Sequence, residues 1–162
     1  MSVIGLIMWI LTAGFGLYLL VIWLIEYDKD FHSVAATRLP PPVLAGHALA
    51  ASGGMTLWIA YLIWGYHRLA WYSVIALVLA ATLGLTMAIR WISVYRAKRV
   101  SDRLAMTGRS APPVVARSYS SRLDAEGPPE RNFPLPVVII HGAFAVTTLT
   151  LVLLTTFGLG GS

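Results

Sequence analysis

The chain has no cysteine and very little charge. Of its 162 residues only 12% are charged, where a soluble domain carries about a quarter. Without a thiol the protein can form no disulfide, iron–sulfur cluster, thiolate zinc site or covalently attached c-type haem. Any metal or haem must therefore be held by histidine, methionine, tyrosine or carboxylate groups.

The usual signatures of hydrolysis and of nucleotide chemistry are also missing from the sequence. It contains no nucleophile elbow, no paired zinc-protease histidines, no glycine-rich phosphate loop and no carboxylate pair within an apolar stretch. Its basic residues match no nucleic-acid-binding module. We therefore expect a protein that is not an enzyme and does not bind nucleic acid.

Four long apolar stretches make up most of the chain, and the mean hydropathy is +0.73. Asp, Glu, Lys and Arg are absent from residues 1–25, 39–67, 69–89 and 132–162. Each stretch reaches the ~20 residues that a helix needs to cross a bilayer core. The first has no basic n-region and is too long for a signal peptide, so it is expected to remain as a helix. We predict an all-α membrane protein, a bundle of four transmembrane helices at about residues 3–25, 43–64, 70–95 and 135–159.

Basic residues are concentrated between the third and fourth predicted helices. Of the twelve Lys and Arg residues, eight lie there: Arg96, Lys98, Arg99, Arg103, Arg109, Arg117, Arg122 and Arg131. Because basic loops stay in the cytoplasm, residues 96–133 are predicted to form a cytoplasmic loop, with both termini outside. The four spans and this distribution of charge predict an integral protein of a bacterial cytoplasmic membrane. The same charges predict attraction to anionic lipid headgroups, with docking of a partner subunit as the alternative.

Two of the four histidines stand in similar surroundings. "PPPVLAGHALAASGG" (40–54) and "PLPVVIIHGAFAVTT" (134–148) each place a histidine five residues after a proline, Pro42 to His47 and Pro136 to His141. In the predicted topology these two helices run parallel, so both histidines lie roughly 7 to 8 Å from the helix starts, at matching depth. The repeat is either a coincidence or the trace of a duplicated helix pair, although the first helices of the two halves do not align convincingly.

The residues around the two histidines suit a haem. Bis-imidazole ligation of a b-type haem requires two neutral histidines on facing helices, small residues to admit the ring, and a basic group near the propionates. Arg90 is the candidate propionate partner, and His47 and His141 are the candidate iron ligands. The small residues that would line the groove are Gly46, Ala50, Ala51, Gly54, Gly142 and Ala145.

This layout is similar to that of four-helix membrane b-type cytochromes, whose haem ligands come from two parallel helices. The resemblance rests on His47, His141 and the small residues beside them. Those proteins usually carry a second histidine one helix-length along each ligand helix, which this chain lacks. The resemblance implies a single haem on the cytoplasmic side, electron transfer and exchange with the quinone pool.

A second interpretation needs no cofactor. Histidines near a membrane surface can be structural, and small residues at helical spacing are the usual device for close helix packing in lipid. The chain would then be an accessory subunit of a larger membrane complex, such as a respiratory electron-transfer complex, in contact with other subunits or with a second copy of itself. The sequence places this interpretation slightly ahead of the haem, and a non-haem ion site is a third option.

Overall fold

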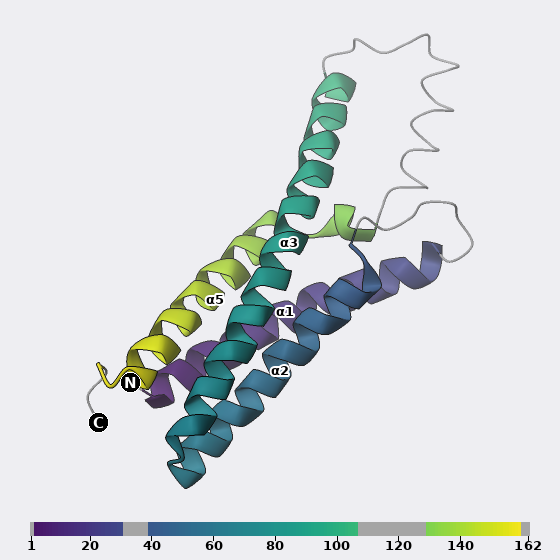
Figure 1. Cartoon of the computed structure of the whole chain (residues 1–162). Coiled ribbons are helices and arrows are strands. Elements are labelled where there is room, and N and C mark those ends of the chain that lie inside the picture. The colour runs from purple at the N-terminus through teal and green to yellow at the C-terminus, as the bar shows by residue number, and fades with distance from the viewer. Residues whose placement is uncertain (1, 31–38, 107–128, 160–162) are drawn as a thin grey trace.

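The computed structural model of the chain describes residues 2–30, 39–106 and 129–159. This part contains four long helices and one 3-10 turn: α1 (Ser2–Asp30), α2 (Pro41–Trp64), α3 (His67–Met106), η1 (Pro129–Asn132) and α5 (Leu135–Thr156) (Figure 1). Every long helix has the length and apolar composition needed to cross a membrane. The prediction of an all-helical bundle with four membrane-length helices is therefore confirmed over the described residues.

Two of the helices, α2 and α5, begin in the same way. The residues that precede them, Pro40 and Pro134, have extended backbone, and each helix has proline in its first turn. Proline suits this position because its φ is already helical and its missing N–H would have no helical acceptor. At the other end of α2, Gly65 has φ 70° and donates its N–H to the Tyr61 carbonyl at 2.8 Å. This left-handed conformation favours glycine and permits the tight turn into α3.

The third helix is longer than the sequence indicated. We predicted its end near residue 95, whereas α3 continues to Met106. Residues 96–106 are polar but contain neither proline nor glycine, and most are good helix formers, so the helix continues beyond its apolar part. Its 40 residues correspond to roughly 60 Å, more than the ~45 Å of a complete bilayer. In Figure 1 its last turns extend past the bundle. The predicted loop 96–133 is thus helical at its start, and its centre, 107–128, lies outside the described residues.

The helices stand at four corners in the order α1, α2, α3, α5. α1 packs closely against α5, and α2 against α3, while fewer contacts join these two pairs. α2 and α5 therefore occupy opposite corners, as do α1 and α3. The start of α1, the end of α5 and the α2–α3 turn lie at what we call the turn end, and α2 and α5 begin at the opposite loop end (Figure 1).

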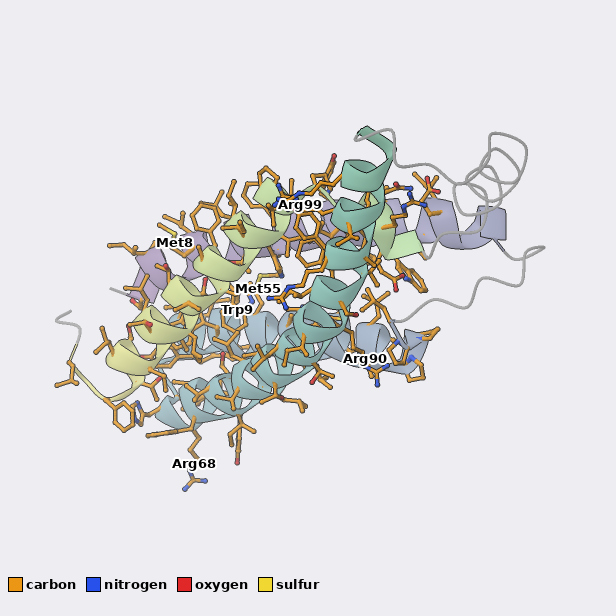
Figure 2. All side chains as sticks on the ribbon, turned by 90° about the horizontal axis from the view of Figure 1, so that it is seen from above. Met8, Trp9, Met55, Arg68, Arg90 and Arg99 are labelled. Carbon is orange, nitrogen blue, oxygen red and sulfur yellow. The ribbon has the colours of Figure 1, made fainter. Side chains whose placement is uncertain are left out.

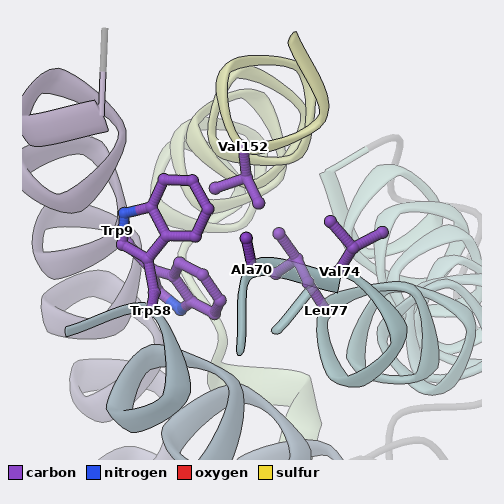
Figure 3. Close-up of a cluster of buried hydrophobic side chains, with 6 residues drawn as sticks. All are labelled: Trp9, Trp58, Ala70, Val74, Leu77 and Val152. Atoms are coloured by element: carbon purple, nitrogen blue, oxygen red, sulfur yellow. The ribbon is translucent and has the colours of Figure 1, made fainter. Parts of the chain in front are cut away.

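The best-packed part of the bundle is its turn-end half. A cluster of buried side chains fills it: Trp9, Trp58, Ala70, Val74, Leu77 and Val152 (Figure 3). The indole N–H of Trp58 donates to the Ser2 carbonyl at 3.2 Å, and the Ser73 hydroxyl donates to the Gly54 carbonyl at 2.9 Å. Lipid tails are as apolar as these side chains, so close packing and such hydrogen bonds hold membrane helices together.

Adjacent glycines in α2 provide a matched test of this packing. A Cβ on Gly54 would lie 3.1 Å from the Ala76 Cβ and 3.2 Å from the Trp9 ring, whereas a Cβ on Gly53 would have no atom within 4 Å. We expect Gly54→Ala to lower the free energy of unfolding by about 1 to 3 kcal/mol. Gly53→Ala should be neutral or stabilising by up to ~1 kcal/mol, because alanine favours the helix. Thermal unfolding of the purified protein in mild detergent measures both, and equal midpoints would contradict the packing described.

Candidate functional site

His47 of α2 and His141 of α5 meet across the centre of the bundle. Their ring centroids are 6.3 Å apart and their planes are inclined at 69°. Since α2 and α5 occupy opposite corners, the two rings span the diagonal between helices whose backbones do not pack against each other. The structure therefore brings together the two histidines that the sequence singled out.

Each ring is held by a backbone carbonyl of a neighbouring helix. The Nδ1 atom of His47 lies 2.8 Å from the Ala80 oxygen of α3, and that of His141 lies 3.0 Å from the Thr12 oxygen of α1. A carbonyl can only accept, so Nδ1 carries the proton and the lone pair of the neutral ring is on Nε2. Within the described part of the chain neither Nε2 has a hydrogen-bond partner. Both rings thus present a nitrogen that can bind a ligand.

A glycine lies against each ring. A Cβ on Gly84 would be 3.0 Å from the His47 Cε1, and a Cβ on Gly16 would be 2.9 Å from the His141 Cε1. Each glycine stands four residues after the carbonyl that accepts the hydrogen bond, so carbonyl and glycine share one face of the helix. Absence of a side chain at Gly16 and Gly84 therefore lets the histidines approach the backbone closely enough to form these bonds.

The two halves of the site have the same design: a histidine from a proline-started helix, a carbonyl on the next helix, and a glycine one turn further on. No family model, curated protein or solved structure matches the chain.

This equivalence extends the repeat that the sequence suggested for α2 and α5 to α1 and α3, the helices whose sequences did not align convincingly. Residues 12–23 ("TAGFGLYLLVIW") and 80–91 ("AATLGLTMAIRW") place the hydrogen-bonding carbonyl first, the glycine fifth and a buried tryptophan last. Those tryptophans, Trp23 and Trp91, are 5% and 6% exposed. α1 thus corresponds to α3, as α2 corresponds to α5. The two segments share a glycine followed by leucine, at Gly16 and Gly84, and this pair could have revealed the repeat. It was hard to recognise because most of the other residues differ.

The residues around the histidines are less buried than those towards either end of the bundle. None of the residues 10–22, 41–53, 81–90 and 135–147, which we call the histidine layer, is buried. Towards the turn end the Trp9 and Trp58 cluster is buried, and towards the loop end Trp23, Trp91 and Glu130 are buried. On α3 the histidine layer lies between the buried residues Ala80 and Trp91, which are roughly 16 Å apart along the helix.

The predicted groove of small residues is shorter than expected. Trp9 and Ala76 occupy the space next to Gly54, and Gly142 is exposed with no atom within 4 Å of its Cβ position. Gly46 faces Leu83 of α3. The remaining members of the predicted groove are half-buried: Ala50, Ala51 and Ala145.

Arg90, the predicted propionate partner, lies on α3 six residues beyond Gly84 and is exposed. It is the one Lys or Arg residue within the histidine layer. Figure 2 shows Arg68 projecting from the turn end of α3, with Arg90 and Arg99 on the loop-end half of the same helix. Arg90 thus lies at the loop-end edge of the histidine layer.

The loop end of the bundle is closed by η1. The Trp91 indole N–H donates to the carbonyl of Glu130, which is fully buried, at 3.1 Å. Lys98 donates to the Arg131 carbonyl at 3.4 Å, and Trp91 stacks on Tyr95 with ring centroids 5.2 Å apart. The histidine layer therefore lies between two packed layers.

Proposed function

We propose that this chain is a membrane cytochrome that binds one b-type haem between His47 and His141 and carries single electrons. The observation that carries the proposal is the pair of opposed histidines, each held through Nδ1 by a backbone carbonyl. A hydrogen bond from Nδ1 to a carbonyl fixes the tautomer and orientation of histidines that bind metals through Nε2.

The separation of the rings agrees with a metal ion between them. Two imidazoles bound through Nε2 to one metal at about 2.0 Å place their ring centroids about 6 Å apart. The observed separation is 6.3 Å. Little movement of either helix would be needed to form both bonds.

Two observations favour a haem over a bare ion. A structural divalent cation usually takes four or more ligands, and no group of three or more His, Cys, Asp or Glu side chains that could hold a metal occurs within the described residues. A porphyrin supplies the four missing nitrogens itself. It would also cover apolar side chains of the histidine layer, none of which is buried, whereas a single ion would leave them as exposed as they are.

The ligand set defines the chemistry. A haem held by both His47 and His141 would supply one-electron chemistry and would not bind a substrate at its iron. His47 and His141 would hold and orient the haem, Arg90 would neutralise a propionate, and the apolar helices would exclude water. The partner we propose is a lipid-soluble quinone, because the lipid-facing surface around the site is apolar. The topology predicted from the basic residues places the haem on the cytoplasmic side.

The test is a dithionite-reduced minus oxidised visible spectrum of the protein purified in mild detergent from haem-sufficient cells. We expect a sharp α-band at the b-type position and one haem per chain by extraction and quantitation. A flat spectrum at full protein loading, together with failure of the purified protein to take up added haemin, would overturn the proposal.

A further inference from the structure

Thr148 of α5 uses its hydroxyl differently from the other threonines of the described helices. It is 1% exposed, and its oxygen lies 3.2 Å from the hydroxyl oxygen of Thr12 in α1. The other threonines in the described part of the chain donate to a carbonyl of their own helix: Thr12, Thr56, Thr82, Thr86, Thr147, Thr150, Thr155 and Thr156. Because the Thr12 hydroxyl donates to the Met8 carbonyl at 2.8 Å, Thr148 donates and the Thr12 hydroxyl oxygen accepts.

Thr12 thus accepts two hydrogen bonds from α5, from opposite directions. Its backbone carbonyl accepts from the His141 Nδ1 atom at 3.0 Å, and its hydroxyl accepts from Thr148. Thr148 follows His141 by seven residues, so both lie on one face of α5, roughly 10 Å apart along the helix. In α1 the carbonyl points towards the loop end and the side chain towards the turn end. A shift of α1 along α5 in either direction would therefore stretch one of the two bonds.

The position of α1 along α5 determines what lies against the His141 ring. Gly16 lies there, and a Cβ on it would be 2.9 Å from the His141 Cε1. A displacement of α1 that moved Gly16 away would bring its neighbours Phe15 and Leu17 closer to the ring. Apolar contacts alone fix this position poorly, because lipid tails offer the helices equally apolar surroundings. The two hydrogen bonds to Thr12 are directional and can fix it.

The His47 half of the site is aligned by other means. α2 and α3 are joined by the tight turn at Gly65, and the Ser73 hydroxyl of α3 donates to the Gly54 carbonyl of α2 at 2.9 Å. α1 and α5 are the first and last helices of the chain and have no such turn between them. On this ground we propose, resting on the proposed function, that Thr148 is a positioning residue for His141. Its hydroxyl fixes the depth of the Thr12 carbonyl, and that carbonyl keeps the His141 proton on Nδ1 and leaves Nε2 for the metal.

Thr148→Val tests this role because it removes the hydroxyl and keeps the branched shape. The Thr12 hydroxyl still donates to Met8, so no buried donor is left unpaired and the fold should survive. We expect haemin to bind about 3 to 20-fold more weakly, the range that single interhelical hydrogen bonds reach within membranes. Thr148→Ser, which keeps the hydroxyl, should bind as the wild type does. The matched control is Thr147→Val, whose lost hydroxyl bonds only the Ala143 carbonyl of its own helix; its affinity should be unchanged.

A second readout uses the protein without haem. With isotope-labelled histidine, nitrogen NMR in detergent reports which ring nitrogen carries the proton, and His47→Ala and His141→Ala assign the signals. We expect Nδ1 in both rings of the wild type. In Thr148→Val part of the His141 population should carry the proton on Nε2, while His47 stays unchanged. Thr12→Val should have the same effect, and the double variant should add nothing to it, because both changes remove one interaction.

The remaining outcomes separate this inference from the proposed function. If Thr148→Val leaves both the His141 tautomer and the haemin affinity unchanged, the inference is overturned. An equal change in both histidines would also overturn it, because the variant would then loosen the whole bundle. Failure of the wild-type protein to bind haemin would overturn the proposed function, and the tautomers of the haem-free protein would still decide the role of Thr148.

Discussion

Replacing either His47 or His141 with alanine is expected to abolish the bis-imidazole spectrum. In the proposed site each ring would supply one of the two protein bonds to iron. Residues 41–53 and 135–147 around the two histidines contain no other His, Met, Tyr or carboxylate that could replace the lost one. The remaining histidine would leave a five-coordinate iron or none. Reduced minus oxidised spectra and haem content, measured on protein purified to the same yield, give the result.

The control is His67→Ala. His67 begins α3 at the turn end and is exposed, far from the ring pair, so its loss should leave the spectrum unchanged. An unchanged spectrum in both His47→Ala and His141→Ala would place the haem elsewhere and contradict the site. If the wild-type protein carries no haem, and replacing either histidine changes no measured property of the protein, the accessory-subunit interpretation becomes the better one.

Placing a methyl group beneath either ring is expected to weaken haem binding by roughly 10 to 100-fold, the range measured for groups that orient a metal ligand. In Gly84→Ala or Gly16→Ala the new Cβ would lie 3.0 or 2.9 Å from the Cε1 of its histidine. The ring must then move away from the wall helix, and its Nδ1–carbonyl bond lengthens or breaks. Titration of the apoprotein with haemin, followed at the Soret band, measures the dissociation constant.

Gly14→Ala is the matched control for these variants. It lies in α1 two residues from Gly16, and its Cβ position has no atom within 4 Å. Its haemin affinity should equal that of the wild type. If Gly84→Ala and Gly14→Ala bind haemin equally well, the glycine has no part in positioning His47.

The elements that the sequence predicted are those with a local cause. The absence of charge over membrane-length stretches predicts four spans, and the prolines before α2 and α5 predict where those helices begin. The spacing from proline to histidine was sufficient to single out His47 and His141. Their contact nevertheless depends on how four helices pack, which no local pattern determines.

The sequence did not predict which groups of the neighbouring helix each histidine contacts. Gly16 and Gly84 are two of fourteen glycines in the chain. Their role depends on a backbone carbonyl one turn earlier, which any residue type could supply. The surroundings of Gly54 could not be foreseen for a similar reason, because Trp9, which lies beside it, comes from a distant part of the chain. The end of α3 was predicted too early because apolar character was used as the criterion, whereas residues 96–106, most of which are good helix formers, continue the helix.

Each helix of one repeat packs mainly on a helix of the other repeat, and this determines the order in which the site can form during synthesis. Each repeat consists of two successive helices, yet α1 packs on α5 and α2 on α3, so neither repeat packs mainly on itself. His47 and the carbonyl it binds are 33 residues apart, so that half can form as soon as the α2–α3 hairpin has entered the membrane. His141 and Thr12 are separated by 129 residues. α1 therefore enters the bilayer well before its packing partner α5 has been synthesised. A cofactor held by both histidines could bind only after α5 is in place.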